Sequence, residues 1–270
     1  MTRDDKELSV VTTAGRIRKG GAWQAGVRDL PEETPVALVY DASTEAVMMA
    51  TPADLEDFAY GFSLTEGLIS GLSDIARLDI VEAEDGIEAR MWLSPERGAS
   101  VASRRRSRVG PTGCGLCGVD SLSDAVRLRG AITAELSLSP AQVGQALKAM
   151  EAGQVLGRRT RAVHAAGFWR PADGFTVVRE DVGRHNALDK LAGALARQGV
   201  APSEGIIVLT SRVSIEMVQK AVAMGAPVLI AVSAPTAFAV RAAEAAGLTL
   251  VAVARGDDFE VFSHPERVSD

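Results

Sequence analysis

The sequence predicts an α/β protein made of two parts, an N-terminal mixed α+β part and a C-terminal layered α/β part. From about Leu138 onward, helical patterns alternate with short apolar strand patterns, which is typical of helices packed on a sheet. Before that point, the strand patterns come in pairs around polar turns. A chain of 270 residues also exceeds the usual size of one domain. We therefore expect one domain over residues 1–137 and a second over residues 138–270.

The N-terminal part is expected to hold two strand pairs with a helix between them. Thr51 is followed by a proline and then by acidic residues, which is typical of an N-cap and the first turn of a helix that runs through Leu64. The run from Ser94 to Asp120 is predicted to be irregular. The expected strands are residues 35–40, 45–49, 77–82 and 87–93.

The C-terminal part is expected to place loops at the carboxyl ends of its strands, where open α/β sheets bind their ligands. Three of these loops begin at Thr210, Ser233 and Arg255. The expected helices are residues 139–152, 184–198, 214–224 and 236–246, and the expected strands are residues 176–179, 205–209, 228–232 and 248–254.

The composition predicts a soluble, cytoplasmic globular protein. Hydrophobic residues make up 47% of the chain and charged residues 24%, and no apolar run reaches the length of a membrane helix. The first residues are polar, and no apolar stretch with a cleavage site follows them. A net charge of −6 argues against broad binding to nucleic acid or to an anionic membrane, because both depend on summed positive charge.

The only two cysteines, Cys114 and Cys117, are separated by two residues and flanked by glycines. In a reducing compartment such a pair is more often chemical than structural. Three glycines within seven residues predict a loop rather than a helix or strand. The reactive form of cysteine is the thiolate, which nearby cations favour. The cations just upstream are Arg104, Arg105, Arg106 and Arg108.

Three other interpretations of the cysteine pair remain open at this point. A structural zinc site needs four ligands, and only three histidines accompany the pair, so no metal site is expected. A thioredoxin-like dithiol would place the motif at the start of a helix in a βαβ unit. The third interpretation is that both cysteines are inert. The histidines are His164, His185 and His264.

Two junctions of the C-terminal part carry side chains suited to an anion. Arg184 and His185 stand where a strand gives way to a helix, and the free N–H groups and dipole of a helix start attract negative charge. Ser211, Arg212 and Ser214 precede the next helix and offer hydroxyl groups and a guanidinium to a phosphate.

A purely structural interpretation of these junctions is equally available. Asp181 or Asn186 could cap the first helix, and His185 could pair with Asp189 one turn later. The serines before the second helix could likewise be ordinary caps.

Motifs along nearly the whole chain resemble those of the FdhD family, the formate dehydrogenase accessory sulfurtransferases. The cysteine segment Gly113-Cys-Gly-Leu-Cys-Gly resembles the cysteine motif of that family. The other matching segments are Glu33-Thr-Pro, Thr51-Pro-Ala-Asp-Leu-Glu-Asp-Phe-Ala-Tyr-Gly-Phe, Glu66-Gly-Leu-Ile, His164-Ala-Ala, Glu180-Asp-Val-Gly-Arg-His-Asn-Ala-Leu-Asp-Lys, Thr210-Ser-Arg-Val-Ser-Ile-Glu-Met-Val-Gln-Lys-Ala, Ser233-Ala-Pro-Thr and Gly247-Leu-Thr-Leu.

This resemblance implies a sulfur carrier whose Cys114 takes sulfur as a persulfide from a cysteine desulfurase. It also implies transfer of that sulfur to the bis-guanylyl molybdenum cofactor, Mo-bis(molybdopterin guanine dinucleotide), which formate dehydrogenase requires. The protein would be a homodimer, and its larger domain a cytidine-deaminase-like three-layer α/β domain. The resemblance leaves the role of Cys117 open.

The resemblance also implies a cofactor-binding stretch near the C-terminus, for which GDP or GMP would be a partial mimic. Phosphate should prefer the helix starts near Arg184 and Ser214, because the acids of this stretch would repel it. Asp257 or Asp258 could instead accept hydrogen bonds from the N1 and amino groups of guanine. The residues of the stretch are Val253, Ala254, Arg255, Gly256, Asp257 and Asp258.

Rival functions come from other classes. Zinc deaminases use H-x-E followed by P-C-x-x-C, with the glutamate as acid and base. Here Ala166 stands where that glutamate belongs after His164, and the cysteine pair precedes the histidine, so deaminase activity is not expected. A cofactor-binding chaperone without sulfur transfer and a C-x-x-C dithiol redox protein remain as alternatives.

Overall fold

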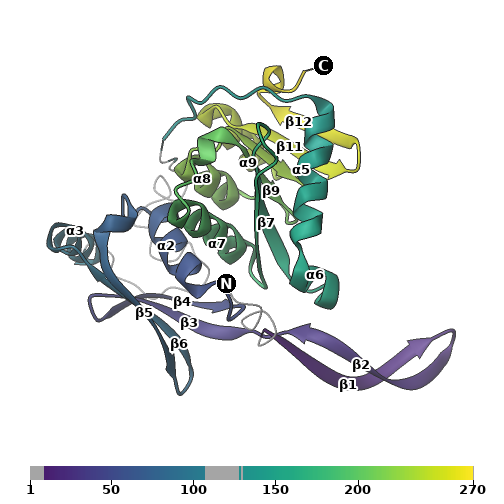
Figure 1. Ribbon diagram of the computed structural model, residues 1–270, viewed down its shortest axis with the longest axis horizontal. Helices are drawn as coiled ribbons and strands as arrows, with labels where there is room; N and C mark the ends of the chain where they lie inside the picture. The colour runs from purple at the N-terminus through teal and green to yellow at the C-terminus, as the bar shows by residue number, and fades with distance from the viewer. Residues whose placement is uncertain (1–8, 107–127, 129, 270) are drawn as a thin grey trace.

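The computed structural model describes residues 9–106, 128 and 130–269, and it consists of a smaller β-rich part below a larger layered part (Figure 1). The helices and strands expected from the sequence are present, and the expected α/β architecture is confirmed. No helix within the described ranges is both long and apolar enough to cross a membrane. The predicted boundary between residues 137 and 138 stays a prediction.

Four strands form the sheet of the N-terminal part, in the order β4-β3-β6-β5. Strands β3 and β6 are parallel, and the outer pairs are antiparallel hairpins. Val36, Leu38 and Tyr40 are fully buried while their neighbours along β3 are partly exposed, because successive side chains of a strand point to opposite faces. The bounds are β3 (Thr34–Tyr40), β4 (Ser43–Ala50), β5 (Ile75–Ala83), β6 (Gly86–Leu93), α2 (Leu55–Thr65), η1 (Leu72–Asp74) and α3 (Pro95–Arg106).

Two expectations for this part are wrong. The helix α2 begins at Leu55 rather than after Thr51, because Thr51 is engaged elsewhere: its Oγ1 accepts a hydrogen bond from the backbone N–H of Val182 at 3.1 Å. The predicted irregular run also begins with a helix, α3, which starts at Pro95 with Glu96 in its first turn. A proline at the first helical position and an acid beside it both favour a helix start.

Ahead of the sheet, the chain forms a long two-stranded hairpin of β1 (Val10–Lys19) and β2 (Ala22–Pro31). Its strands meet at Gly20 and Gly21, which both have positive φ values of 59° and 84°. A two-residue turn with positive φ at both positions matches the right-handed twist of the strands, and glycine adopts it without strain. The hairpin projects away from the rest of the molecule (Figure 1).

The C-terminal part is built on a six-stranded sheet in the order β12-β11-β10-β9-β7-β8. Strands β9, β10 and β11 are parallel, whereas β7 is antiparallel to both β9 and β8, and β12 is antiparallel to β11. The bounds are β7 (His164–Trp169), β8 (Thr176–Asp181), β9 (Ile206–Leu209), β10 (Val228–Ala231), β11 (Thr249–Arg255) and β12 (Asp258–Ser263).

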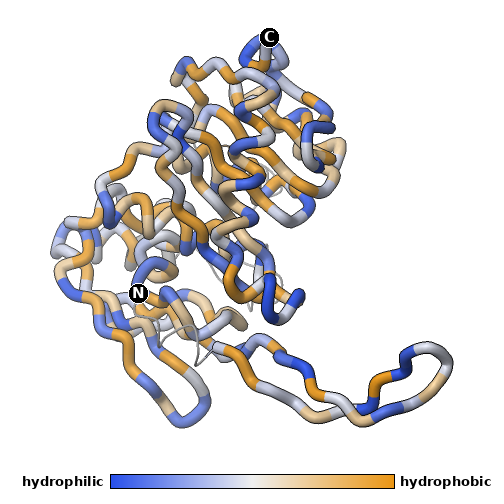
Figure 2. The backbone as a smooth tube through the Cα atoms, turned by 45° about the vertical axis from the view of Figure 1, so that its right-hand side comes forward, coloured by the Kyte–Doolittle hydropathy of each residue, from blue (hydrophilic) through white to orange (hydrophobic). Residues whose placement is uncertain are grey.

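Helices cover both faces of this sheet and complete three layers. Leu188 of α7, Met217 of α8 and Ala243 of α9 pack on one face. Val143 and Met150 of α5 pack on the other. Figure 2 shows the central strands as mostly hydrophobic segments enclosed by the helices. The bounds are α5 (Pro140–Gly153), α6 (Val155–Thr160), α7 (Arg184–Arg197), η2 (Pro202–Glu204), α8 (Ile215–Met224), α9 (Ala237–Ala246) and η3 (Pro265–Arg267).

The two parts are joined by the close crossing of α2 and α7. A Cβ atom at Gly61 would lie 1.7 Å from the carbonyl oxygen of Asp189, and one at Gly193 would lie 1.9 Å from that of Asp57. Only glycine lets the two backbones approach this closely. Ion pairs surround the crossing, including those of Asp57 with Arg179 at 2.7 Å and with Arg197 at 2.6 Å.

Replacing Gly193 with alanine is therefore expected to destabilise the protein by about 3 kcal/mol or more, because the new methyl group meets backbone that cannot rotate away. Urea unfolding measures the effect. The matched control is Gly71→Ala, since a Cβ atom there meets nothing within 4 Å. Equal stability of the two variants would contradict the proposed role of Gly193 in the helix crossing.

Candidate functional site

One edge of the six-stranded sheet gathers the polar residues that the sequence singled out. Strands β8, β9, β10 and β11 run in the same direction, so their carboxyl ends lie at this edge, and the antiparallel β7 begins there with His164. The segments Asp181 to Asn186, Thr210 to Ser214 and Val253 to Asp258 therefore lie along one edge. We call it the carboxyl edge.

A cavity of about 390 Å³ opens at the carboxyl edge on the α5 side of the sheet. Three residues of the predicted cofactor stretch line it, namely Ala254, Arg255 and Gly256, together with Thr210. Helices α5 and α6 supply the facing wall, which includes Gln154 and Arg158. The lining therefore combines two arginines with a threonine, a glutamine and one acidic residue, Glu151. Such a set can hold a phosphorylated ligand.

The backbone is irregular where β11 enters the cavity. Val253 has a φ of 53°, and the pairing with β12 shifts register between Ala252 and Arg255. A β-branched residue rarely adopts this left-handed conformation, and bulges of this kind re-aim side chains beside binding sites. Asp257 and Asp258 are exposed and are not among the residues that line the cavity.

A buried carboxylate, Glu180, holds the α6 wall of the cavity. Its two oxygens accept hydrogen bonds from the backbone N–H groups of Leu156 at 2.8 Å and Gly157 at 2.7 Å. An acid at a helix start is favourable because the free N–H groups carry partial positive charge. Sequence reasoning did not identify Glu180 as part of the site.

On the opposite face of the sheet, the starts of α7 and α8 form a second polar region at the same edge. Neither helix is capped by a side chain: α7 begins after Gly183, and the hydroxyl of Ser214 makes no cap hydrogen bond. The other two long helices of this domain differ. Ser139 forms a capping box at α5, and Thr236 Oγ1 accepts the N–H of Ala239 at 3.1 Å at α9.

Three buried polar atoms at these helix starts have no hydrogen-bond partner within the described part of the chain. They are Nε of Arg184, Nε2 of His185 and Oγ of Ser214. Buried polar groups are nearly always satisfied, so unsatisfied atoms gathered at one place indicate a missing partner. Together with the uncapped N–H groups, the donors of this region suit an anion.

Charges of both signs surround His185 in this region: the cations are Arg184 and Lys220, and the carboxylates are Glu216 and Glu66. Burial, followed by the charges of Arg184 and Lys220, lowers the pKa of His185 to about 4. Burial and the charge of Arg184 also lower the pKa of His164. Both imidazoles are therefore neutral near pH 7, and Arg184 supplies the cation that an anion would meet.

The low pKa of His185 predicts a specific loss of stability in acid. An imidazole in the unfolded chain titrates near pH 6.5, so between about pH 6.5 and 4 the unfolded state binds a proton that the folded state does not. Stability should therefore fall across this range and be unaffected by His185 above it. Relative to His185→Asn, the wild type should lose about 2–3 kcal/mol between pH 7 and pH 4. The prediction would be contradicted if the urea midpoints of the wild type and of His185→Asn fell by the same amount between pH 7 and pH 4.

The remaining sequence-predicted residues fall in different places. Arg212 is exposed, whereas Ser211 is buried and donates a hydrogen bond from Oγ to the carbonyl of Arg212 at 3.1 Å. Cys114 and Cys117 lie outside the described residues. The predicted pair of His185 with Asp189 is wrong, because Asp189 instead contacts Lys220 Nζ at 2.8 Å.

The expected capping of α7 by Asp181 or Asn186 is also wrong. Asp181 is fully buried and forms an ion pair with Lys190 at 2.6 Å. It also accepts hydrogen bonds from Asn186 Nδ2 and from the N–H groups of Gly183 and Thr51 at 3.0, 2.7 and 3.0 Å. These contacts fix the turn that carries Arg184 and His185. Lys190 and Thr51 were not identified from the sequence, where each looks like an ordinary helix or cap residue.

Comparisons with known proteins agree with this architecture. The family model described as the FdhD/NarQ family matches residues 31–269. A sulfur carrier protein FdhD of Agrobacterium fabrum is 49% identical over 263 residues, which is 97% of each chain. The sulfur carrier protein FdhD of Brucella abortus is 51% identical over 247 residues, covering 91% of this chain and 92% of that protein.

A solved crystal structure from Desulfotalea psychrophila, described as that of a formate dehydrogenase accessory protein, shares the fold. The TM-score is 0.76 at 24% sequence identity, and the match covers 96% of this chain and 99% of the other. The expected family is thereby confirmed from sequence and the fold from structure. The chain belongs to the FdhD/NarQ family.

Proposed function

We propose that this chain is a sulfur carrier that takes sulfur from a cysteine desulfurase as a persulfide on Cys114 and transfers it to the bis-guanylyl molybdenum cofactor of formate dehydrogenase. The observation that carries the proposal is the match over nearly the whole chain with relatives named as sulfur carriers. The only two cysteines, which form the glycine-flanked pair, supply the chemistry that such a role needs.

The loading step is an exchange at sulfur. The Cys114 thiolate attacks the terminal sulfur of the desulfurase persulfide, a new S–S bond forms on Cys114, and the desulfurase cysteine leaves as a thiolate. The arginines upstream of the pair favour the attacking thiolate. The partners of the protein would be a cysteine desulfurase and the formate dehydrogenase apo-enzyme, and the exchange would take place in the cytoplasm.

Mass spectrometry tests this step directly. After incubation with a cysteine desulfurase and cysteine, the intact protein should gain the mass of one sulfur atom, and peptide mapping should place it on Cys114. A dithiol redox protein would instead lose two hydrogens on oxidation, and a chaperone would show no change of mass. Sulfur found on Cys117 alone, or no sulfur on either cysteine, would refute the proposed carrier.

The carboxyl edge would bind the guanine nucleotide ends of the cofactor. The cavity beside Ala254 to Gly256 and the uncapped helix starts at Arg184 and Ser214 offer positive charge and free donors to phosphates. Asp257 or Asp258 lies next to the cavity residues in sequence and could accept the paired donors of guanine. Ser211 and Arg212 complete the proposed set.

Replacing Arg184 with alanine is expected to weaken GDP binding roughly 10- to 100-fold, because one charge-assisted hydrogen bond to a phosphate is lost. Calorimetry measures the affinity. Arg212→Ala should have a smaller effect, since an exposed guanidinium is screened by solvent. The control is Arg170→Ala, which removes an arginine at the opposite edge of the sheet.

The same titrations test base recognition. GDP or GMP should bind more tightly than ADP, and Asp258→Ala should reduce that difference more than the overall affinity. Equal binding of GDP and ADP, or an unchanged GDP affinity in Arg184→Ala, would contradict the proposal that the carboxyl edge binds the guanine nucleotide ends of the cofactor.

A further inference from the structure

The cavity on the α5 side of the carboxyl edge has two apolar walls. Leu147 and Met150 belong to α5, whereas Val232 follows β10 and Ala254 lies near the end of β11. All four belong to or pack against the hydrophobic core on this face of the sheet. A flat heteroaromatic ring can lie between such walls, and the thioether of a methionine makes favourable contacts with rings. The apolar part of the cavity therefore suits a ring rather than a phosphate.

Glu151 is the one acidic residue among the described residues that line this cavity. It is exposed near the end of α5, and its carboxylate has no hydrogen bond or ion pair within the described part of the chain. A carboxylate offers only acceptors, so a ligand that binds it must present donors. Two adjacent N–H donors on one edge of a ring would satisfy both of its oxygens at once.

The size of the cavity limits how much of a ligand it can hold. Its volume of about 390 Å³ lies near the lower end of the range for ligand pockets, which is roughly 300–1,000 Å³. One ring system with its attachment fits this space, whereas a whole dinucleotide does not. Arg158 and Arg255, which line the cavity and are exposed to solvent, could hold the phosphates of a longer ligand outside it.

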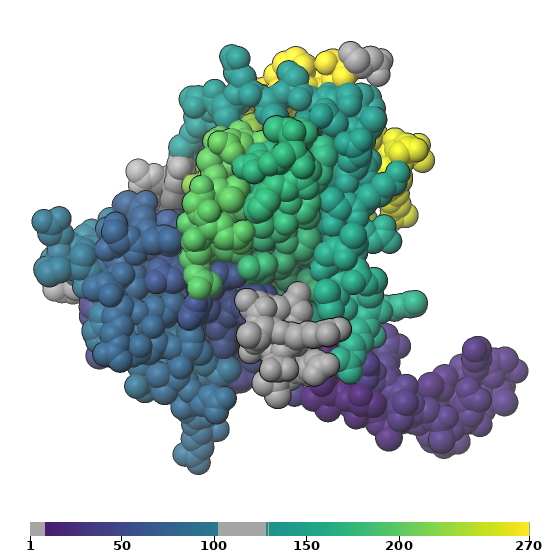
Figure 3. All heavy atoms as spheres, viewed as in Figure 1, coloured from purple at the N-terminus to yellow at the C-terminus, as the bar shows by residue number. Residues whose placement is uncertain are grey.

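A second carboxylate lies farther along the same face of α5. A Cβ atom at Gly144 would lie 3.2 Å from Asp257 Oδ1 and 3.6 Å from the carbonyl oxygen of Gly256, so the turn after β11 approaches the helix there. Figure 3 shows the C-terminal residues, in yellow, beside the teal surface that contains α5. Gly144 and Glu151 are seven residues apart, which places them on one face of the helix and about 10 Å apart along its axis.

Two acceptors at this spacing match a ligand with a donor-bearing ring at each end and phosphates between them. Arg255 lines the cavity and precedes Asp257 by two residues, so it connects the two positions. Each half of the bis-guanylyl cofactor has this order, since it consists of a pterin, two phosphates and a guanosine. Pterin and guanine also share a 2-amino-4-oxopyrimidine edge, on which an N–H and an amino group are adjacent donors.

We propose that this cavity holds the pterin ring of the cofactor and that Glu151 accepts the paired N–H and amino donors of its pyrimidine edge. The pterin site, which rests on the proposed function, adds the other end of each cofactor half to the guanine nucleotide end. Guanine is left to Asp257 or Asp258, which do not line the cavity. Glu151 is thereby a specificity-determining residue, and sequence reasoning did not identify it.

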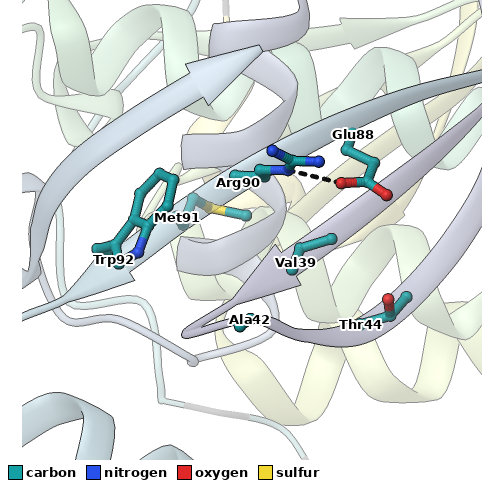
Figure 4. Close-up of a pocket in the computed structure, with 7 residues that line it drawn as sticks. All are labelled: Val39, Ala42, Thr44, Glu88, Arg90, Met91 and Trp92. Atoms are coloured by element: carbon teal, nitrogen blue, oxygen red, sulfur yellow. Dashed lines mark hydrogen bonds and ion pairs between the residues drawn. The ribbon is translucent and has the colours of Figure 1, made fainter. Parts of the chain in front are cut away.

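A second hollow provides a matched control for Glu151. It measures about 330 Å³ and is formed by residues of β3, β4 and β6 and of the turn after β3. Figure 4 shows that its acidic residue, Glu88, is joined to Arg90, and their charged atoms lie 2.6 Å apart. Because Glu88 already has a cationic partner, its carboxylate is not free for the donors of a ligand.

Equilibrium dialysis with pterin and with lumazine tests the assignment, with the protein in excess and the ring detected by its fluorescence. Lumazine carries an oxygen in place of the amino group, so it presents an acceptor where pterin presents a donor. The wild type should bind pterin with a Kd of about 1 mM or lower and lumazine about 10-fold more weakly. Glu151→Gln should lose about 10-fold in pterin affinity and prefer lumazine, because an amide can donate to the added oxygen. Glu88→Gln should behave like the wild type.

GDP separates the pterin site from the proposed function. GDP and pterin should bind at the same time, and Glu151→Gln should leave the GDP affinity unchanged. Displacement of pterin by GDP, or weaker GDP binding in Glu151→Gln, would place guanine in the cavity and overturn the pterin site while the proposed function stands. Absence of pterin binding, or an unchanged preference for pterin in Glu151→Gln, would also overturn it. Pterin binding that depends on Glu151 in a protein that does not bind GDP would refute the nucleotide site alone.

Discussion

Replacing Lys190 with alanine is expected to destabilise the protein by about 3–5 kcal/mol, because it leaves the carboxylate of Asp181 buried without its cation. Both side chains have no solvent exposure, and their charged atoms lie 2.6 Å apart. Lys190 Nζ also donates to the carbonyl of Thr51 at 2.8 Å, which would lose its partner as well. Urea unfolding followed by far-UV circular dichroism measures the loss.

Two further variants test whether the unpaired charge of Asp181 causes the loss of stability in Lys190→Ala. The double variant Asp181→Asn/Lys190→Met removes both charges and should recover part of the lost stability, because no uncompensated charge remains in the interior. Arg77→Ala removes a cation from an ion pair in which the arginine side chain is 67% exposed, and it should change stability by about 0.5 kcal/mol or less. A loss in Lys190→Ala as small as that in Arg77→Ala would show that the buried ion pair of Lys190 and Asp181 does not stabilise the fold.

The regular elements were largely predictable from the sequence because their patterns follow local rules. Val36, Leu38 and Tyr40 alternate with less buried residues along β3, as a half-buried strand requires. The continuous apolar runs of β9 and β10 match strands buried on both faces. Together with the family motifs, these patterns led to the correct fold class and family.

The site was less predictable because distant residues compete for the groups that local rules assign. Thr51 has the sequence context of a helix cap, but its hydroxyl binds Val182 from the other part of the chain. His185 and Asp189 have the spacing of a helix pair, yet Lys220 and Thr65 contact Asp189 instead. No spacing rule within one helix can anticipate a partner that arrives from another element.

The hairpin of β1 and β2 was difficult to predict for a different reason. Its strands show no alternation of apolar and polar residues, because neither face is covered within the chain, and Figure 2 shows hydrophobic and hydrophilic segments interspersed along it. A strand without a core face lacks the period-two pattern that identifies strands from sequence. Gly20-Gly21 is a local feature that favours a tight turn, but two glycines alone do not identify the strands on either side of it.

Replacing Cys114 with alanine is expected to abolish activation of formate dehydrogenase, since the thiolate that would carry the sulfur is removed. Cys117→Ala should retain measurable activation, because transfer through a single persulfide needs one thiol, whereas dithiol redox chemistry needs both. The measurement is formate oxidation by an apo-enzyme preparation after incubation with each variant, the desulfurase and cysteine. Urea midpoints and GDP affinities, which do not involve the cysteines, should be equal for all three proteins and serve as the control. Activation that survives loss of both cysteines would favour a cofactor-binding chaperone, and equal, complete loss in the two single variants would favour a dithiol mechanism over the carrier proposed here.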